Sequence, residues 1–308
     1  MTFYIDTFKN PWLYVKENTQ ETWINLRMFE TSMSLGPFSI PKLVVSKGAL
    51  QVISGFSFEH DKFHAEGTCK MVDGVKKHAL VHCVQRVVYN MENFAACANE
   101  VIFASLLSEH KGICKLYRTY LYPQVDRNYF TVAFLAERLQ GDLSDFKGTD
   151  LELHLLILQV AKAIEFVHGK RVILCDFKFE NVLVSRSEDG LIARLCDFYG
   201  AFIEGTVPPK YAYTYDYASP ELLRNRSEIT RATDVFAFTV SLLKKVEDLE
   251  EPATSLKIIY NDRHTFNCAY RATLEVIRHC THFKSIYKNI VRAALDPNPV
   301  TRPIIQWI

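Results

Sequence analysis

Four side chains that lie close together in the sequence carry groups suited to phosphoryl transfer. They are Asp176, Lys178, Asn181 and Asp197. That reaction requires a carboxylate that accepts the proton of the attacking hydroxyl, oxygen ligands that hold Mg²⁺ against the phosphates, and a cation that offsets charge on the migrating group. Two carboxylates, one carboxamide and one ammonium supply this set. The pattern therefore predicts a magnesium-dependent phosphoryl-transfer site.

The elements that must position these groups can be predicted from the same region. Apolar residues recur at three- and four-residue intervals from Leu151 to His168, which indicates a helix ending shortly before the first aspartate. Apolar runs at Val182–Val184 and Leu191–Leu195 flank a turn at Glu188–Gly190. We therefore expect a helix, a loop, and two short strands joined by a turn.

The run from Asp176 to Asn181 resembles the catalytic loop of protein kinases, D-x-K-x-x-N, and Asp197-Phe198 resembles their magnesium loop, D-F-G. The resemblance implies that Asp176 is the catalytic base and Lys178 its partner on the phosphate side. It also implies that Asn181 and Asp197 are metal ligands, that ATP and Mg²⁺ are the cofactors, and that a protein Ser or Thr hydroxyl is the acceptor. The competing interpretation, a solvated turn, is disfavoured because further motifs agree.

Three later segments also resemble kinase motifs. They are Thr214–Glu221 for the end of the activation segment, Asp234–Phe238 for the start of the central buried helix, and Asp296–Pro303 for the late D-P-x-x-R-P motif. In kinases the arginine of that last motif pairs with the glutamate of A-P-E. We therefore expect an ion pair between Arg302 and Glu221.

The segment that should bind the nucleotide departs from the kinase pattern. Only Gly55 remains of the loop glycines that let the backbone approach the phosphates, and a plain β-turn is the competing interpretation. Glu100 resembles the glutamate that pairs with the ATP lysine, but the usual spacing from it leads to Val81. Three other lysines are near, each of which could instead be a solvated surface residue: Lys62, Lys76 and Lys77. The predicted cofactor site comprises Gly55, Lys77, Glu100, Asn181 and Asp197.

Strand-like runs come first in the chain and helical patterns follow, which predicts an α+β, two-lobed protein kinase-like fold. We expect an N-terminal extension at 1–45 and a kinase-like domain at 46–308, with an N-lobe at 46–137 and a C-lobe at 138–308. Within the N-lobe, Asp73-Gly74 predicts a hairpin turn.

Composition narrows the class of protein. The chain has 308 residues, of which 48% are hydrophobic and 23% charged, as in globular domains. A net charge of +1 gives no reason to expect nucleic acid or an anionic membrane surface as a partner. We expect neither a signal peptide nor a transmembrane helix. Eight cysteines without a CxxC pair argue against a zinc site and favour an intracellular, cytoplasmic or nuclear, location.

A more particular resemblance is to the spindle-checkpoint Bub kinases. It rests on four short segments: Asn10-Pro11-Trp12, Ile40–Leu43, Cys83–Arg86 and Asp197–Ile203. It implies a cell-cycle role and a checkpoint or scaffold protein as partner. Asp296-Pro297 and Arg302 do not fit that family, and Trp12 and Trp23 could simply anchor the extension.

Two functions of different classes remain open. Retention of the four polar residues supports a Ser/Thr protein kinase, since Lys178 is typical of the Ser/Thr form of the loop. Loss of the ATP lysine and of the loop glycines supports a pseudokinase that acts as a binding or scaffolding module. A kinase of small molecules is a third alternative, which the peptide-site segment Thr214–Glu221 disfavours.

Overall fold

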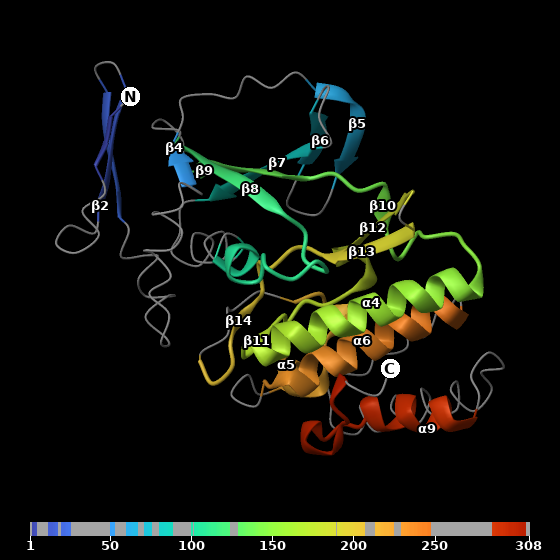
Figure 1. Cartoon of the computed structure of the whole chain (residues 1–308). Coiled ribbons are helices and arrows are strands. Elements are labelled where there is room, and N and C mark those ends of the chain that lie inside the picture. The colour runs from blue at the N-terminus through green and yellow to red at the C-terminus, as the bar shows by residue number, and fades with distance from the viewer. Residues whose placement is uncertain are drawn as a thin grey trace. The chain divides into compact units, whose positions relative to one another are not determined.

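The computed structural model describes part of the chain, which divides into two compact units (Figure 1). The described residues are 2–4, 12–17, 20–25, 50–52, 60–66, 71–75, 80–88, 100, 102–123, 129–188, 190–206, 213–224, 229–247 and 285–305. One unit comprises residues 1–109 and 113–139, and the other comprises 110–112 and 140–308.

A three-stranded antiparallel sheet lies at the start of the first unit. Its strands are β1 (Thr2–Tyr4), β2 (Trp12–Glu17) and β3 (Gln20–Asn25), in that order. Trp23 of β3 lies opposite Tyr14 of β2, and Trp12 lies opposite Asn25. The sequence indicated aromatic anchors in this extension but not its strands.

The larger sheet of the first unit has six strands in the order β4-β8-β9-β7-β6-β5. They are β4 (Leu50–Val52), β5 (His60–Glu66), β6 (Met71–Val75), β7 (Leu80–Val88), β8 (Leu116–Pro123) and β9 (Tyr129–Glu137). Only β4 and β8 pair in parallel among the described strands, and the other neighbours are antiparallel. A helix at residues 102–106 belongs to the same unit and buries Ile102 and Phe103.

One local expectation for this sheet was wrong. The hairpin turn expected at Asp73-Gly74 is absent, because both residues lie inside β6, where Gly74 pairs with Val81 and Asp73 with His82. The pairing of β6 with strands on both sides outweighs the turn preference of the Asp-Gly dipeptide. Residues 60–66, which follow Gly55 in the chain, form strand β5 with an irregular register between His60 and His64.

Helix α4 (Asp150–Gly169) opens the helical part of the second unit and matches the predicted helix. A capping box fixes its start, with the Thr149 side chain accepting from the Glu152 amide and the Glu152 carboxylate accepting from the Thr149 amide. Its apolar stripe, including Leu156, Val160 and Ile164, is buried. Because the stripe repeats every three or four residues, it forms one face of the helix.

Short strands and further helices complete the second unit (Figure 1). They are β10 (Gly141–Asp142), β11 (Val172–Ile173), β12 (Val182–Ser187), β13 (Gly190–Leu195), β14 (Phe202–Ile203), α5 (Pro220–Arg224), α6 (Arg231–Glu247), α9 (Ser285–Ala294) and the 3₁₀ helices η1 (Phe179–Asn181), η2 (Tyr215–Tyr217) and η4 (Pro299–Thr301). Strand β12 pairs with β10 and β13, and β11 pairs with β14. Helix α4 packs on β11 and β13, and α6 packs on β11, η1, η2 and α9.

Aromatic side chains join the loop after β11 to helix α6. Phe177 and Phe179 meet edge to face with ring centroids 6.0 Å apart, and both approach Phe238 at 5.6 and 6.1 Å. All three are buried. Alternate residues of the D-F-K-F-E-N run therefore point into the core, and Asp176 and Lys178 are left on the other side of the loop. Within the described residues, no helix is long and apolar enough to cross a membrane.

Candidate active site

The backbone that carries Asp176 is held by a buried carboxylate on α6. Asp234 is fully buried and accepts hydrogen bonds from the amides of Leu174 and Cys175, each at 2.9 Å. Its Oδ2 also lies 2.9 Å from Nε2 of His168, at the end of α4. Cys175 has a φ of 66°, in the left-handed region that costs a non-glycine residue about 1–3 kcal/mol. The bonds to Asp234 hold this strained turn in place.

Asp176, Lys178 and Thr214 form a closed set of contacts. The Asp176 Oδ2 lies 3.2 Å from the Lys178 Nζ, and its Oδ1 accepts from the Thr214 amide at 2.6 Å. Lys178 also donates to the Thr214 hydroxyl at 2.6 Å. The side chains of Asp176 and Lys178 retain 21% and 20% of their exposure. A carboxylate and an ammonium thus lie side by side at a partly open position.

The Asp176 carboxyl titrates above its usual range. Burial raises its pKa, and the neighbouring charge of Asp197 raises it further. The charge of Lys178 and the hydrogen bonds from Thr214 oppose this shift without cancelling it. A base whose pKa lies closer to neutral accepts a proton more readily in the transition state, so this environment suits general-base catalysis.

Asn181 and Asp197 lie at the same end of the β12–β13 hairpin. The Asn181 carbonyl accepts from the amide of Cys196 at 2.9 Å, and Val182 pairs with Leu195 in the ladder. The Asn181 Nδ2 donates to the Asp176 carbonyl at 3.0 Å, which leaves its Oδ1 as the side-chain oxygen. Asp197 has a φ of 63°. A carboxylate and an amide oxygen are ligands that Mg²⁺ accepts, so the donor set fits this metal.

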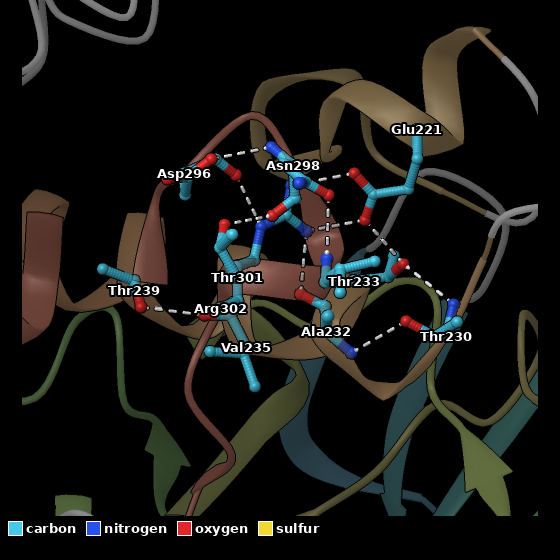
Figure 2. A network of polar contacts seen from close by, with 11 residues as sticks. Glu221, Thr230, Ala232, Thr233, Val235, Thr239, Asp296, Asn298, Thr301 and Arg302 are labelled. Atoms are coloured by element: carbon cyan, nitrogen blue, oxygen red, sulfur yellow. Dashed lines mark hydrogen bonds and ion pairs between the residues drawn. The ribbon is translucent and has the colours of Figure 1, made fainter. Parts of the chain in front are cut away.

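The ion pair expected between Arg302 and Glu221 is confirmed (Figure 2). The Arg302 Nη1 and Nη2 donate to the two Glu221 oxygens at 2.6 and 2.9 Å, and both side chains are buried. Glu221 also accepts from the Thr233 hydroxyl at 2.9 Å, while Arg302 donates to the carbonyls of Ala232 and Asp296. This network joins helix α5, which carries Glu221, to Arg302, the residue that follows η4.

The predicted nucleotide residues of the first unit remain untested. Gly55 and Lys77 lie outside the described residues. Glu100 is helical and half-buried. Val81, His82 and Cys83 are central residues of β7, paired with both β6 and β9, and none of the nine residues of β7 is a lysine.

Two residues of the site were not predicted in their observed roles. Asp234 was interpreted as the start of a helix, yet it binds the loop that carries Asp176. Thr214 was assigned to the end of the activation segment, yet it contacts both Asp176 and Lys178. The sequence signal for Asp234 was a carboxylate within the apolar run D-V-F-A-F, where a buried charge requires partners.

Residues 68–308 match the sequence model of the protein kinase domain. This chain belongs to the protein kinase family. The predicted family and its α+β fold are thereby confirmed. The match to the protein kinase domain does not show the more particular resemblance to the Bub kinases.

Several kinases match parts of the chain. The Serine/threonine-protein kinase dkf-2 of Caenorhabditis briggsae is 32% identical over 113 residues, which is 34% of this chain and 9% of that protein. The Serine/threonine-protein kinase D2 of Rattus norvegicus is 29% identical over 169 residues, 52% of this chain and 18% of that protein. Mitogen-activated protein kinase 10 of Arabidopsis thaliana is 29% identical over 136 residues, 42% of this chain and 34% of that protein. The matched segments thus span between 9% and 34% of these relatives.

Proposed function

We propose that this kinase-family chain transfers the γ-phosphoryl group of ATP, with Mg²⁺, to a Ser or Thr hydroxyl of a protein substrate. The observation that carries this proposal is the contact set in which Asp176 lies 3.2 Å from Lys178 and accepts from Thr214. A partly open carboxylate beside an ammonium is the pairing that hydroxyl attack on a phosphate requires. The Ser/Thr names of the matched relatives agree with the form of this loop.

Each group of the set has a role in this proposal. Asp176 accepts the proton of the substrate hydroxyl, and its raised pKa makes it a better acceptor. Lys178 offsets negative charge that develops during transfer and, through Thr214, fixes the segment beside Asp176. Asp234 keeps the loop in its strained conformation so that Asp176 is already oriented.

Asn181 and Asp197 are the proposed holders of Mg²⁺. Their oxygens lie at the same end of one hairpin, and the Asn181 amide group is oriented by its bond to the Asp176 carbonyl. When bound, ATP and Mg²⁺ supply the phosphoryl group and the positive charge that neutralises it. Gly55, Lys77 and Glu100 stay predictions for the nucleotide side, as do the domain limits at 1–45, 46–137 and 138–308.

The pseudokinase alternative is favoured by one observation. Strand β7 presents Val81, His82 and Cys83 where kinases carry the ATP lysine. Loss of a cation that clamps phosphates costs orders of magnitude in rate, so a chain without a substitute lysine would bind partners rather than catalyse. The checkpoint role implied by the Bub resemblance also stays a prediction, and its segments Asn10-Pro11 and Ile40–Leu43 lie outside the described residues.

A paired assay separates the enzyme from the pseudokinase. Wild type, Asp197→Asn and Lys77→Met are tested for transfer to generic Ser/Thr peptides and for nucleotide-dependent thermal shift, each with and without Mg²⁺. The proposal expects wild-type transfer that requires Mg²⁺ and is lost in Asp197→Asn. A ligand at 100 times its dissociation constant stabilises a fold by about 2.7 kcal/mol, which is a measurable shift. No transfer by the wild type, with or without a thermal shift, would establish the pseudokinase interpretation.

A further inference from the structure

A second charged cluster lies close to the reactive pair and takes no part in the proposed chemistry. The buried Tyr217 hydroxyl donates to the Glu180 Oε1 at 2.5 Å and accepts from the Lys244 Nζ at 3.0 Å. The Lys244 ammonium also lies 4.1 Å from the centroid of the Tyr217 ring. One phenol thus binds a carboxylate and an ammonium at once.

This cluster joins the same three elements that hold the reactive groups. Tyr217 ends η2, and Thr214 immediately precedes the first residue of η2. Glu180 lies in η1, which Lys178 precedes. Lys244 lies on α6, the helix that also carries Asp234. Any motion of η2 away from η1 and α6 would therefore carry Thr214 away from Asp176.

The polar contacts of this cluster should hold η2 firmly against η1 and α6. Burial and the Glu180 carboxylate raise the pKa of Tyr217, so the phenol keeps its proton and donates it. Hydrogen bonds to charged groups are stronger than bonds between neutral groups. An ammonium over an aromatic face adds a further attraction.

We propose that Tyr217 and Lys244 are positioning residues, which clamp η2 to η1 and α6 and so hold Thr214 in its contacts with Asp176 and Lys178. The kinetic part of this inference rests on the proposed function, because it concerns the rate of phosphoryl transfer. The structural part does not, because the hydrogen bond from the Thr214 amide to Asp176 can be measured in the absence of any reaction.

Lys245 provides a matched control on the same helix. Its Nζ donates to the carbonyls of Ser144 and Phe146 at 2.7 and 2.6 Å, in the segment that follows β10. Lys245→Met therefore removes a neighbouring ammonium and its bonds, as Lys244→Met does, but leaves the clamp on η2 intact. A loss that arises from general destabilisation should appear in both variants.

Amide hydrogen exchange at Thr214 tests the clamp directly. The Thr214 amide donates to the Asp176 Oδ1 at 2.6 Å, so its exchange reports whether that contact persists. Tyr217→Phe and Lys244→Met should speed this exchange about tenfold, and Lys245→Met should not. Lys244→Arg should restore protection, because a guanidinium can also donate to the phenol and lie over its ring.

Kinetics provide the second readout. Tyr217→Phe and Lys244→Met should lower kcat about tenfold, less than the loss of a general base, with little change in KM for ATP. Unchanged Thr214 exchange in both variants, or an equal change in Lys245→Met, overturns the inference. An inactive wild type overturns the proposed function alone, since the exchange result still decides the clamp.

Discussion

The pairs Glu221–Arg302 and Asp176–Lys178 each join a carboxylate to a cation, but one is closed and the other is open. The side chains of Glu221 and Arg302 are 2% and 0% exposed, and two hydrogen bonds of 2.6 and 2.9 Å link them. The Asp176 and Lys178 side chains are 21% and 20% exposed, and a single contact of 3.2 Å links them. Both pairs lie in the second unit and within segments that resemble kinase motifs.

The difference distinguishes a structural pair from a chemical one. Arg302 also donates to two carbonyls and Glu221 accepts from Thr233, so their polar groups are engaged within the fold. A buried charge with several partners is costly to disturb, because removal of one partner strands the other. Asp176 keeps access to solvent, and its pKa is raised rather than lowered. The environment of Asp176 therefore favours gain and loss of a proton over a permanently ionised pair with Lys178.

The largest effect on stability is expected for Arg302→Ala. This change strands the Glu221 carboxylate in the interior, so the free energy of unfolding should fall by about 3–5 kcal/mol. Urea denaturation measures it. Arg186→Ala is the matched control, because Arg186 pairs with Glu152 at 2.6 Å but is 55% exposed, and its effect should be clearly smaller. Equal losses in the two variants would contradict the closed character of the Glu221–Arg302 pair.

Asp234→Asn should have the next largest effect. An asparagine retains one acceptor oxygen but turns its NH₂ toward a backbone donor, so the amide of Leu174 or Cys175 loses its partner. One buried donor without a partner costs about 1–3 kcal/mol. Transfer activity should fall as well, since the Cys175 turn orients Asp176. Full retention of both stability and activity would show that the loop does not depend on Asp234.

Thr149→Ala extends the comparison to an exposed network. The Thr149 side chain caps α4 through the Glu152 amide, far in sequence from the reactive residues. Loss of such a cap costs about 1 kcal/mol. The melting temperature should fall slightly and the kinetic constants should stay unchanged. A change in kcat would mean that α4 is coupled to the site more tightly than its contacts indicate.

The smallest effect concerns pH. The folded-state pKa of Asp176 lies above its ordinary value of 3.8. In the pH window between these two pKa values, the native state therefore holds a proton that the unfolded state has lost. This group therefore favours folding at low pH, and its contribution is lost as pH rises through the raised pKa. Wild type should become less stable relative to Asp176→Asn across that window, as chemical denaturation at several pH values would measure. A constant difference would mean that the Asp176 pKa is not raised.

The sequence predicted regular elements and pairs within motifs better than contacts between segments that are distant along the chain. Helix α4 and the Arg302–Glu221 pair were predicted because strong periodicity and a motif with two charged ends specify them. The contacts of Thr214 and Asp234 were not predicted, because they depend on how a segment far along the chain folds back onto the loop that carries Asp176. In the first unit, the Asp73-Gly74 turn was wrong because pairing between strands overrides a local preference.

Transfer by wild type and Asp176→Asn under saturating ATP and Mg²⁺ tests the central claim, that Asp176 is an open, chemical carboxylate, most directly. The substitution keeps the shape of the side chain but removes its basicity, so the rate should fall about 10²–10⁴-fold. The free energy of unfolding should hardly fall near neutral pH, because the charged form is disfavoured by burial. An unchanged rate, or a wild type that shows no transfer above the Asp176→Asn background, would contradict the account.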